Sequence, residues 1–124
     1  MAEQKLEVIN KAADLMEYSI RITSNKKRYP AKFRQLIARI QDYSMDIYEL
    51  LIDANRLKLE DSKSKRLDLQ TRVINSCDKL SGLIEMSMNL GLVGSETVGN
   101  WQKKISDVKY MTIGWRSRDR LRQN

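Results

Sequence analysis

Four acidic residues at helical spacing are the first group in this sequence that could do chemistry. Carboxylates bind metal ions and act as general acids or bases, and on a helix these four would share an arc of about 60°. They are Asp42, Asp46, Glu49 and Asp53. The chain has no histidine that could complete a metal site of the usual kind. We therefore interpret the row as a solvated face, or as a face that pairs with a basic partner surface.

The missing residue types exclude several classes of enzyme. Without histidine there is no Ser-His-Asp or Cys-His nucleophile and no Glu-x-x-His di-iron site. No glycine-rich phosphate loop of the Walker or dinucleotide-binding type occurs. Cys77 is the single cysteine and falls on an apolar helical stripe, where a thiol acts as a small hydrophobic side chain. We expect no enzymatic activity, no cofactor and no bound metal.

Positive charge is concentrated in one segment of the chain. The 124 residues carry a formal net charge of +7. Residues 18–41 contain seven cations and no acid, so this segment alone accounts for the whole excess. The seven cations are Arg21, Lys26, Lys27, Arg28, Lys32, Arg34 and Arg39.

Several of these cations crowd the predicted N-terminus of a helix that begins at Pro30. The helix dipole disfavours cations there, so a bound anion would stabilise the arrangement. Free backbone N–H groups at a helix N-terminus are also suited to phosphate. We therefore predict contact with a nucleic-acid backbone, with a merely solubilising surface as the alternative. Tyr29, beside the cluster, could stack on a base.

A second basic group lies near the end of the chain. Its members are Arg116, Arg118, Arg120 and Arg122. We predict nucleic-acid contact here too, although cations at a helix C-terminus are favoured by the dipole and an i, i+2 spacing points them around the helix. In an antiparallel bundle this group lies about 40 Å from the first cluster. One molecule therefore cannot hold a short ligand with both groups.

Apolar periodicity of three and four residues predicts four long helices, at about 5–24, 30–57, 62–90 and 95–121. Pro30 suits a first helical position, Gly91 a C-cap and Ser95 an N-cap. Short connections between amphipathic helices predict an all-α fold, an antiparallel up-down-up-down four-helix bundle that forms a single domain over 1–124. One cysteine and no long apolar run predict a cytoplasmic protein with no membrane contact.

The predicted core stripes differ in clarity from helix to helix. The last helix has one stripe, formed by Val98, Trp101, Ile105, Val108, Thr112 and Trp115. The first helix has two adjacent stripes. The first is Leu6, Ile9, Ala13, Met16 and Ile20, and the second is Val8, Ala12, Leu15, Ser19 and Ile22. On the second helix, Met45, Tyr48 and Ile52 form an extra apolar strip beside the core face. We interpret this strip either as peripheral packing or as a subunit interface.

Four segments of the chain resemble the accessory variability proteins of diversity-generating retroelements. The segments are Asn-Lys-Lys-Arg-Tyr-Pro at 25–30, Met-Asp-Ile-Tyr-Glu-Leu-Leu-Ile-Asp-Ala-Asn at 45–55, Leu-Gly-Leu-Val at 90–93 and Asp-Val-Lys-Tyr-Met-Thr-Ile-Gly-Trp-Arg at 107–116. The resemblance covers nearly the whole chain. It places the chain near a wider group of bacterial four-helix proteins, which includes those encoded in intervening sequences of large-subunit ribosomal RNA genes.

The resemblance implies a basic homopentameric barrel of four-helix bundles without catalytic activity. Such proteins bind the reverse transcriptase of the retroelement and its template RNA and cDNA, and support the mutagenic retrohoming that diversifies a target gene. Two alternatives stay open. One is a stand-alone structural RNA-binding bundle of the ribosomal-RNA intervening-sequence type. The other is a protein-interaction bundle with no role in nucleic-acid binding.

Overall fold

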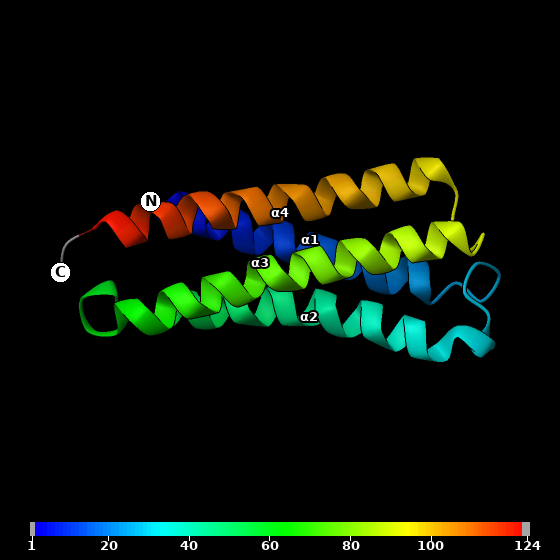
Figure 1. Ribbon diagram of the computed structural model, residues 1–124, viewed down its shortest axis with the longest axis horizontal. Coiled ribbons are helices and arrows are strands. Elements are labelled where there is room, and N and C mark those ends of the chain that lie inside the picture. Colours follow the sequence, from blue (N-terminus) through cyan, green and yellow to red (C-terminus); the bar gives the residue numbers. More distant parts are fainter. Residues whose placement is uncertain (1, 123–124) are drawn as a thin grey trace.

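The computed structural model describes residues 2–122, and their side chains from residue 7 onward. The chain forms α1 (Ala2–Thr23), the short 3-10 helix η1 (Ala31–Phe33), α2 (Arg34–Arg56), α3 (Leu59–Asn89) and α4 (Ser95–Leu121). Each α-helix packs against the next one in sequence, and α1 also packs against α4. The result is an antiparallel up-down-up-down four-helix bundle, as predicted (Figure 1).

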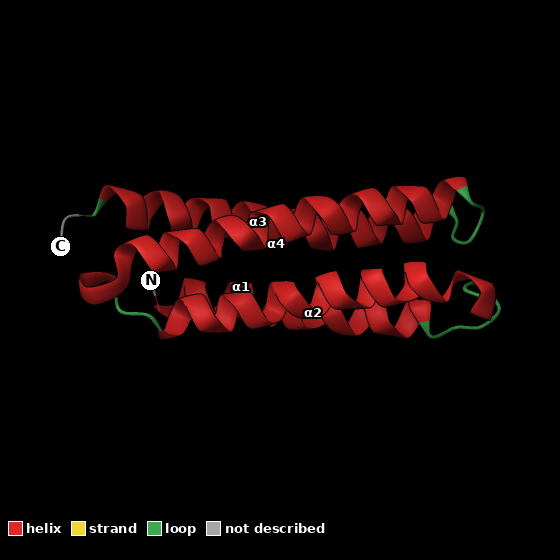
Figure 2. Ribbon diagram, turned by 60° about the horizontal axis from the view of Figure 1, so that its bottom comes forward, coloured by secondary structure: helices red, strands yellow, loops and turns green. Residues whose placement is uncertain are grey.

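The bundle is a long rod in which the connections lie only at the two ends (Figure 2). Because the number of antiparallel helices is even, α1 begins and α4 finishes at the same end (Figure 1). The α1–α2 and α3–α4 connections lie together at the opposite end.

The core follows the three-four periodicity of the sequence most closely in α4. All six residues of the predicted α4 stripe are buried, and Asp119 continues the stripe by one more turn. On α2 the buried face consists of Ile40, Ser44, Ile47, Leu51 and Ala54. These faces show that alternating steps of three and four residues place side chains on one side of a helix.

On α1 the buried face follows the second of the two predicted stripes. It consists of Val8, Ala12, Leu15 and Ser19 and continues to Thr23, whereas Ile22, which the prediction placed on this stripe, is half-buried. Ile20, from the first stripe, is 36% exposed. Ser19 is polar, but its hydroxyl is hydrogen-bonded within the core. Ser19 Oγ donates to Leu15 O (2.8 Å) and accepts from Trp101 Nε1 (2.9 Å).

Three helix termini also differ from the prediction. Pro30 precedes η1, so α2 begins at Arg34 rather than at residue 30. α3 begins at Leu59, before a kink at Ser62, where the backbone is non-helical (φ −141°, ψ 36°). Ser95 is the first residue of α4, and Gly94 takes the N-cap position without a side-chain cap.

α3 ends at Asn89 with Leu90 as its C-cap, and Gly91 takes the left-handed position after the helix, as predicted. Gly91 adopts φ +75°, a left-handed conformation that glycine adopts without steric strain. Leu92 N donates to Ser87 O and Gly91 N donates to Met88 O, each at 2.9 Å. This pair of hydrogen bonds is the Schellman motif, and it turns the chain toward α4.

Candidate nucleic-acid interface

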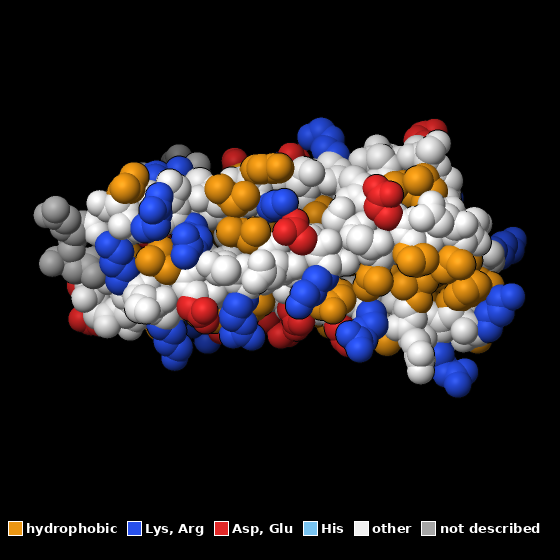
Figure 3. All heavy atoms as spheres, in the orientation of Figure 1, with side chains coloured by type: hydrophobic (Ala, Val, Ile, Leu, Met, Phe, Trp, Pro, Cys, Tyr) orange, Lys and Arg blue, Asp and Glu red, His pale blue; other side chains and the backbone are white. Residues whose placement is uncertain are grey.

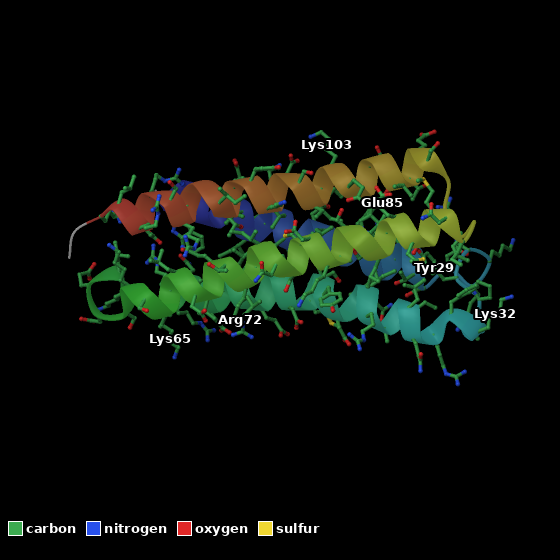
Figure 4. All side chains as sticks on the ribbon, in the orientation of Figure 1. Tyr29, Lys32, Lys65, Arg72, Glu85 and Lys103 are labelled. Atoms are coloured by element: carbon green, nitrogen blue, oxygen red, sulfur yellow. The ribbon has the colours of Figure 1, made fainter. Side chains whose placement is uncertain are left out.

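Five of the predicted binding residues gather where α1 ends and α2 begins. We call this group the basic end, and it consists of Lys26, Lys27, Arg28, Lys32 and Arg34. All five side chains are exposed, and no ion pair joins any of them to a carboxylate among the described residues. Figure 3 shows basic side chains around this end of the rod, and Lys32 projects outward from it (Figure 4).

The backbone at the basic end adds to its positive potential. Neither η1 nor α2 has an acidic residue in its first turn, and neither N-cap residue, Pro30 or Phe33, makes a side-chain cap. The dipole of α2 is therefore not offset locally by an acidic side chain. An anion at this position would meet both the helix N-terminus and the exposed cations.

A groove of about 470 Å³ lies at this end, between the last turn of α1 and the first turns of α2. Lys26 lines it from the connection and Arg34 from α2, with the hydroxyl-bearing Ser24 nearby. Gln41 Nε2 donates to Thr23 Oγ1 (2.9 Å) and so ties the two helices together beside the groove. Hydroxyl and cationic groups of this kind are suited to phosphate oxygens.

The basic end is also fixed to the start of α4. Arg28 Nη1 donates to Thr97 Oγ1 (3.2 Å) in the first turn of that helix. Asn25 Oδ1 accepts from Lys27 N (3.0 Å), an Asx-turn that shapes the connection. The cations are therefore carried by a connection with defined hydrogen bonds.

Tyr29 cannot stack on a base, and that interpretation was wrong. Its side chain is fully buried within the core, although its neighbours in the connection are exposed. Tyr29 N donates to Asn25 O (2.8 Å), in the turn that precedes η1. Burial raises the pKa of the Tyr29 phenol, and the hydroxyl of Ser87 and the charge of Arg28 lower it by less.

The other two cations of the segment lie on the flanks of the rod. Arg21 is exposed on α1 and pairs with Glu17 at 2.6 Å. Arg39 is exposed on α2 and lines a shallow groove with Leu36 and Leu83. Arg21 is thus paired with an acid of its own helix, and Asp42 lies in the same groove as Arg39, so neither residue adds an unpaired cation to the basic end.

The members of the second basic group differ in exposure and in their contacts. Arg116 is half-buried, and its Nε donates to Thr71 Oγ1 (2.8 Å) and to Leu67 O (3.3 Å) of α3. Arg118 is half-buried, whereas Arg120 is exposed. On a helix, Arg116 and Arg120 are one turn apart and share a side of α4, whereas Arg118 lies on the other side. The guanidinium of Arg116 is already hydrogen-bonded to α3.

A buried ion pair near this group, between Arg66 and Asp119, was not predicted from the sequence. Arg66 and Asp119 are only 3% and 2% exposed, and Arg66 Nε lies 2.7 Å from Asp119 Oδ2. Gln70 Nε2 donates to the same carboxylate (2.8 Å), and Arg66 Nη1 donates to Leu57 O (2.9 Å). The signal in the sequence was an acid one turn beyond Trp115 on the core stripe, because such an acid needs a buried partner.

All four residues of the acidic row on α2 are exposed. Asp46, Glu49 and Asp53 line a polar groove of about 410 Å³, across which lie Arg72 and Lys79 of α3. Within residues 2–122, no three potential ligands of the His, Cys, Asp and Glu types come together as a metal site would need.

The extra apolar strip of α2 reaches the first stripe of α1 through Tyr48. Met45, Tyr48 and Ile52 are all half-buried. Tyr48 lines a groove of about 450 Å³ with Ala13, Met16 and Ile20 of α1. We call these residues the α1–α2 apolar surface; they are Ala13, Met16, Ile20, Met45, Tyr48 and Ile52.

Comparison of the chain with known protein families, with curated proteins and with solved structures gave no match. None of the helices described is both long and apolar enough to cross a membrane.

Proposed function

We propose that this chain is a non-enzymatic protein that binds RNA through the basic end. The observation that carries the proposal is a set of five exposed cations, without ion-pair partners among the described residues, at the uncapped N-terminus of α2. Phosphate groups would neutralise these cations and the helix dipole together. Contacts of this kind are made to the backbone, so binding is strong at low salt and weakly dependent on sequence.

The partners follow from the resemblance to the accessory variability proteins. On this basis the RNA is the template of a diversity-generating retroelement, with its cDNA, and the protein partner is the reverse transcriptase. Two exposed apolar residues near the end of α3 support a protein contact close to the RNA. Met86 is 50% exposed and Leu90 is 48% exposed, and hydrophobic side chains gather in this region (Figure 3).

Self-association is the third part of the proposal. The α1–α2 apolar surface combines residues of two helices on the outside of the bundle. Surfaces of this kind become buried when subunits associate. A homopentamer would bring five basic ends together and give the RNA a continuous positive surface.

The salt dependence of RNA binding tests the central claim. A structured RNA is titrated at several salt concentrations between roughly 50 and 200 mM, and log affinity is plotted against log salt, since the slope counts neutralised phosphates. The test variant changes four residues of the basic end to Gln: Lys27, Arg28, Lys32 and Arg34. The control variant removes the same charge elsewhere, at four exposed positions: Arg56, Lys65, Arg72 and Lys79.

We expect the slope to become shallower by about 3 to 4 in the test variant and to change much less in the control. An equal decrease of the slope in both variants would mean that the total charge of the protein, and not the basic end, governs RNA binding. No binding even at low salt would reject the proposal and favour a protein-interaction bundle. RNA binding without any complex with a co-expressed reverse transcriptase would favour the stand-alone RNA-binding bundle.

A further inference from the structure

Tyr110, on α4, is the one strongly exposed aromatic side chain of this protein. The chain has two Trp, five Tyr and one Phe, and all of them lie within the described side chains. Tyr110 is 64% exposed, whereas the other seven are buried or half-buried. It lies outside the α4 core stripe, so packing of the bundle does not explain an aromatic residue here.

The ring of Tyr110 stands beside a groove between α1 and α4. The groove has a volume of about 610 Å³, and Lys11, Lys103, Met111 and Gly114 line it together with Tyr110. Gly114 follows Tyr110 by one helical turn and has no side chain of its own, and Arg118 Nη1 lies 3.4 Å from the place that a Cβ of Gly114 would take. The site therefore combines an accessible aromatic face with open space next to it.

The charges around the groove favour an anion beside the ring. Lys11 and Lys103 approach the same carboxylate, that of Asp107, at 3.9 and 3.4 Å, so one acid faces two cations. Lys103 is 76% exposed and extends away from the bundle (Figure 4). The ammonium of Lys109 lies 5.5 Å from the centre of the Tyr110 ring, although it also pairs with Asp78.

A flat apolar group joined to phosphates matches this combination. We propose that Tyr110 stacks on a base of single-stranded RNA, while Lys11 and Lys103 contact the adjoining phosphates. Bases in a duplex stack on one another and are not accessible to the ring, so the site selects unpaired nucleotides. This inference rests on the proposed RNA binding and extends it to a second contact.

The position of Tyr110 is compatible with one strand that reaches both contacts. Tyr110 lies 15 residues after Ser95 on α4, or about 22 Å along the helix. The start of α4 is joined to the basic end through Arg28 and Thr97. A strand bound at the basic end therefore reaches Tyr110 by following the exposed side of α4.

Substitutions at Tyr110 separate stacking from general apolar contact. Tyr110→Leu keeps an apolar side chain but removes the ring, whereas Tyr110→Trp keeps a stacking surface. The matched control is Leu121→Ala, which truncates another exposed apolar residue of α4. The probes are an oligoadenylate of about twelve nucleotides, the same strand with abasic positions, and an RNA duplex of equal length.

We expect Tyr110→Leu to weaken binding of the oligoadenylate by roughly tenfold, and Tyr110→Trp to preserve it. We expect neither substitution to change the affinity for the duplex. We also expect wild type to bind the abasic strand with the same reduced affinity that Tyr110→Leu shows for the oligoadenylate. The new indole also reports stacking by fluorescence quenching, since Trp101 and Trp115 are only 0% and 4% exposed.

Four results would overturn the inference. Unchanged oligoadenylate binding by Tyr110→Leu, or an equal loss for the duplex, would show that the ring does not stack on a base. A change in the molecular mass of Tyr110→Leu in solution, with RNA affinity unaltered, would identify a subunit contact instead. Wild-type protein that binds neither probe would reject the proposed function as well, which distinguishes the two failures.

Discussion

The ion pair between Arg66 and Asp119 shows how single residues hold the far end of the bundle together. Removing two charges from water costs several kcal/mol per ion, and good geometry must offset that cost. Here the guanidinium makes two hydrogen bonds to the carboxylate, at 2.7 and 3.2 Å. It also lies 5.1 Å from the centre of the Trp115 ring and binds the carbonyl that ends α2, that of Leu57.

We predict that Asp119→Asn lowers the free energy of unfolding by about 3 to 5 kcal/mol, because it leaves the Arg66 charge buried without a counter-charge. Urea denaturation followed by circular dichroism measures the change. The control is Glu17→Gln, which removes the partner of the exposed Arg21, and we expect it to stay within about 0.5 kcal/mol of wild type. Similar values for the two variants would contradict a structural role for the buried pair.

Cys77 makes stability depend on pH in the alkaline range. Burial raises the pKa of its thiol from 9.0 to about 12, with a smaller rise from Asp78. Above pH 9 the unfolded chain releases this proton while the folded chain keeps it. The contribution of Cys77 to the free energy of unfolding is therefore fully present below pH 9, and it is lost as the pH rises toward 12.

We expect the stability of wild type to fall relative to Cys77→Ala by about 1.4 kcal/mol per pH unit within this range. Urea denaturation of both proteins at several pH values measures the difference. Tyr29 titrates in both proteins, so its raised pKa cancels in the comparison. Parallel curves for the two proteins would show that Cys77 is accessible to solvent.

At the scale of the helices, regular periodicity was the part of the fold that the sequence predicted well. α4 has a single apolar stripe, and its residues are buried as expected. α1 has two adjacent stripes, and the choice between them depends on partners such as Trp101, which bonds Ser19. A helix cannot indicate from its own residues which of two similar faces meets a distant neighbour.

Helix termini were harder to predict than helix faces, since local residues permit several starts. Pro30 is compatible with the first turn of an α-helix and equally with the extended position before η1, which it occupies with ψ 159°. The third helix was predicted to start at residue 62, yet α3 begins at Leu59 and kinks at Ser62. Gly91 was predictable because a left-handed residue after a helix is nearly always glycine or asparagine.

Substitution of two glycines by alanine should change the stability of the protein in opposite directions. Added Cβ atoms at Gly91 and Gly99 would meet nothing within 4 Å, so steric contact does not distinguish the two positions. Gly91→Ala should destabilise by about 1 to 2 kcal/mol because of its positive φ, and Gly99→Ala should stabilise by about 1 kcal/mol within α4. Calorimetric unfolding of the two variants measures both changes. A stabilising Gly91→Ala would contradict the left-handed terminus of α3.

At the scale of the whole molecule, the basic end was predictable because its cations are neighbours in the sequence. Charge counting along the chain locates such a cluster, and the structure keeps five of the seven cations together. Burial was not predictable in the same way. Tyr29 is buried in the core, and Arg116 is hydrogen-bonded to α3. Both contacts depend on helices that are distant in the sequence, so the residues next to Tyr29 and Arg116 do not predict them.

The α1–α2 apolar surface should control the assembly of the molecule. We predict that Ile20→Lys lowers the oligomeric state, because a charge placed on a buried interface must lose its hydration. Light scattering after size-exclusion chromatography, at several protein concentrations, measures the mass. Ile20 is 36% exposed in the single chain, so the bundle itself should tolerate the change. The control is Leu121→Lys, and a wild type that stays monomeric at every concentration would contradict the prediction.

The even number of antiparallel helices has a practical consequence. Because α1 begins and α4 finishes at the end opposite the basic end, a tether at either terminus holds the molecule from the same side (Figure 1). Protein immobilised in this way on a sensor surface would stand with its α1–α2 connection facing the solution. Attachment through either terminus should therefore give the same RNA-binding capacity, whereas attachment through the connection should block it.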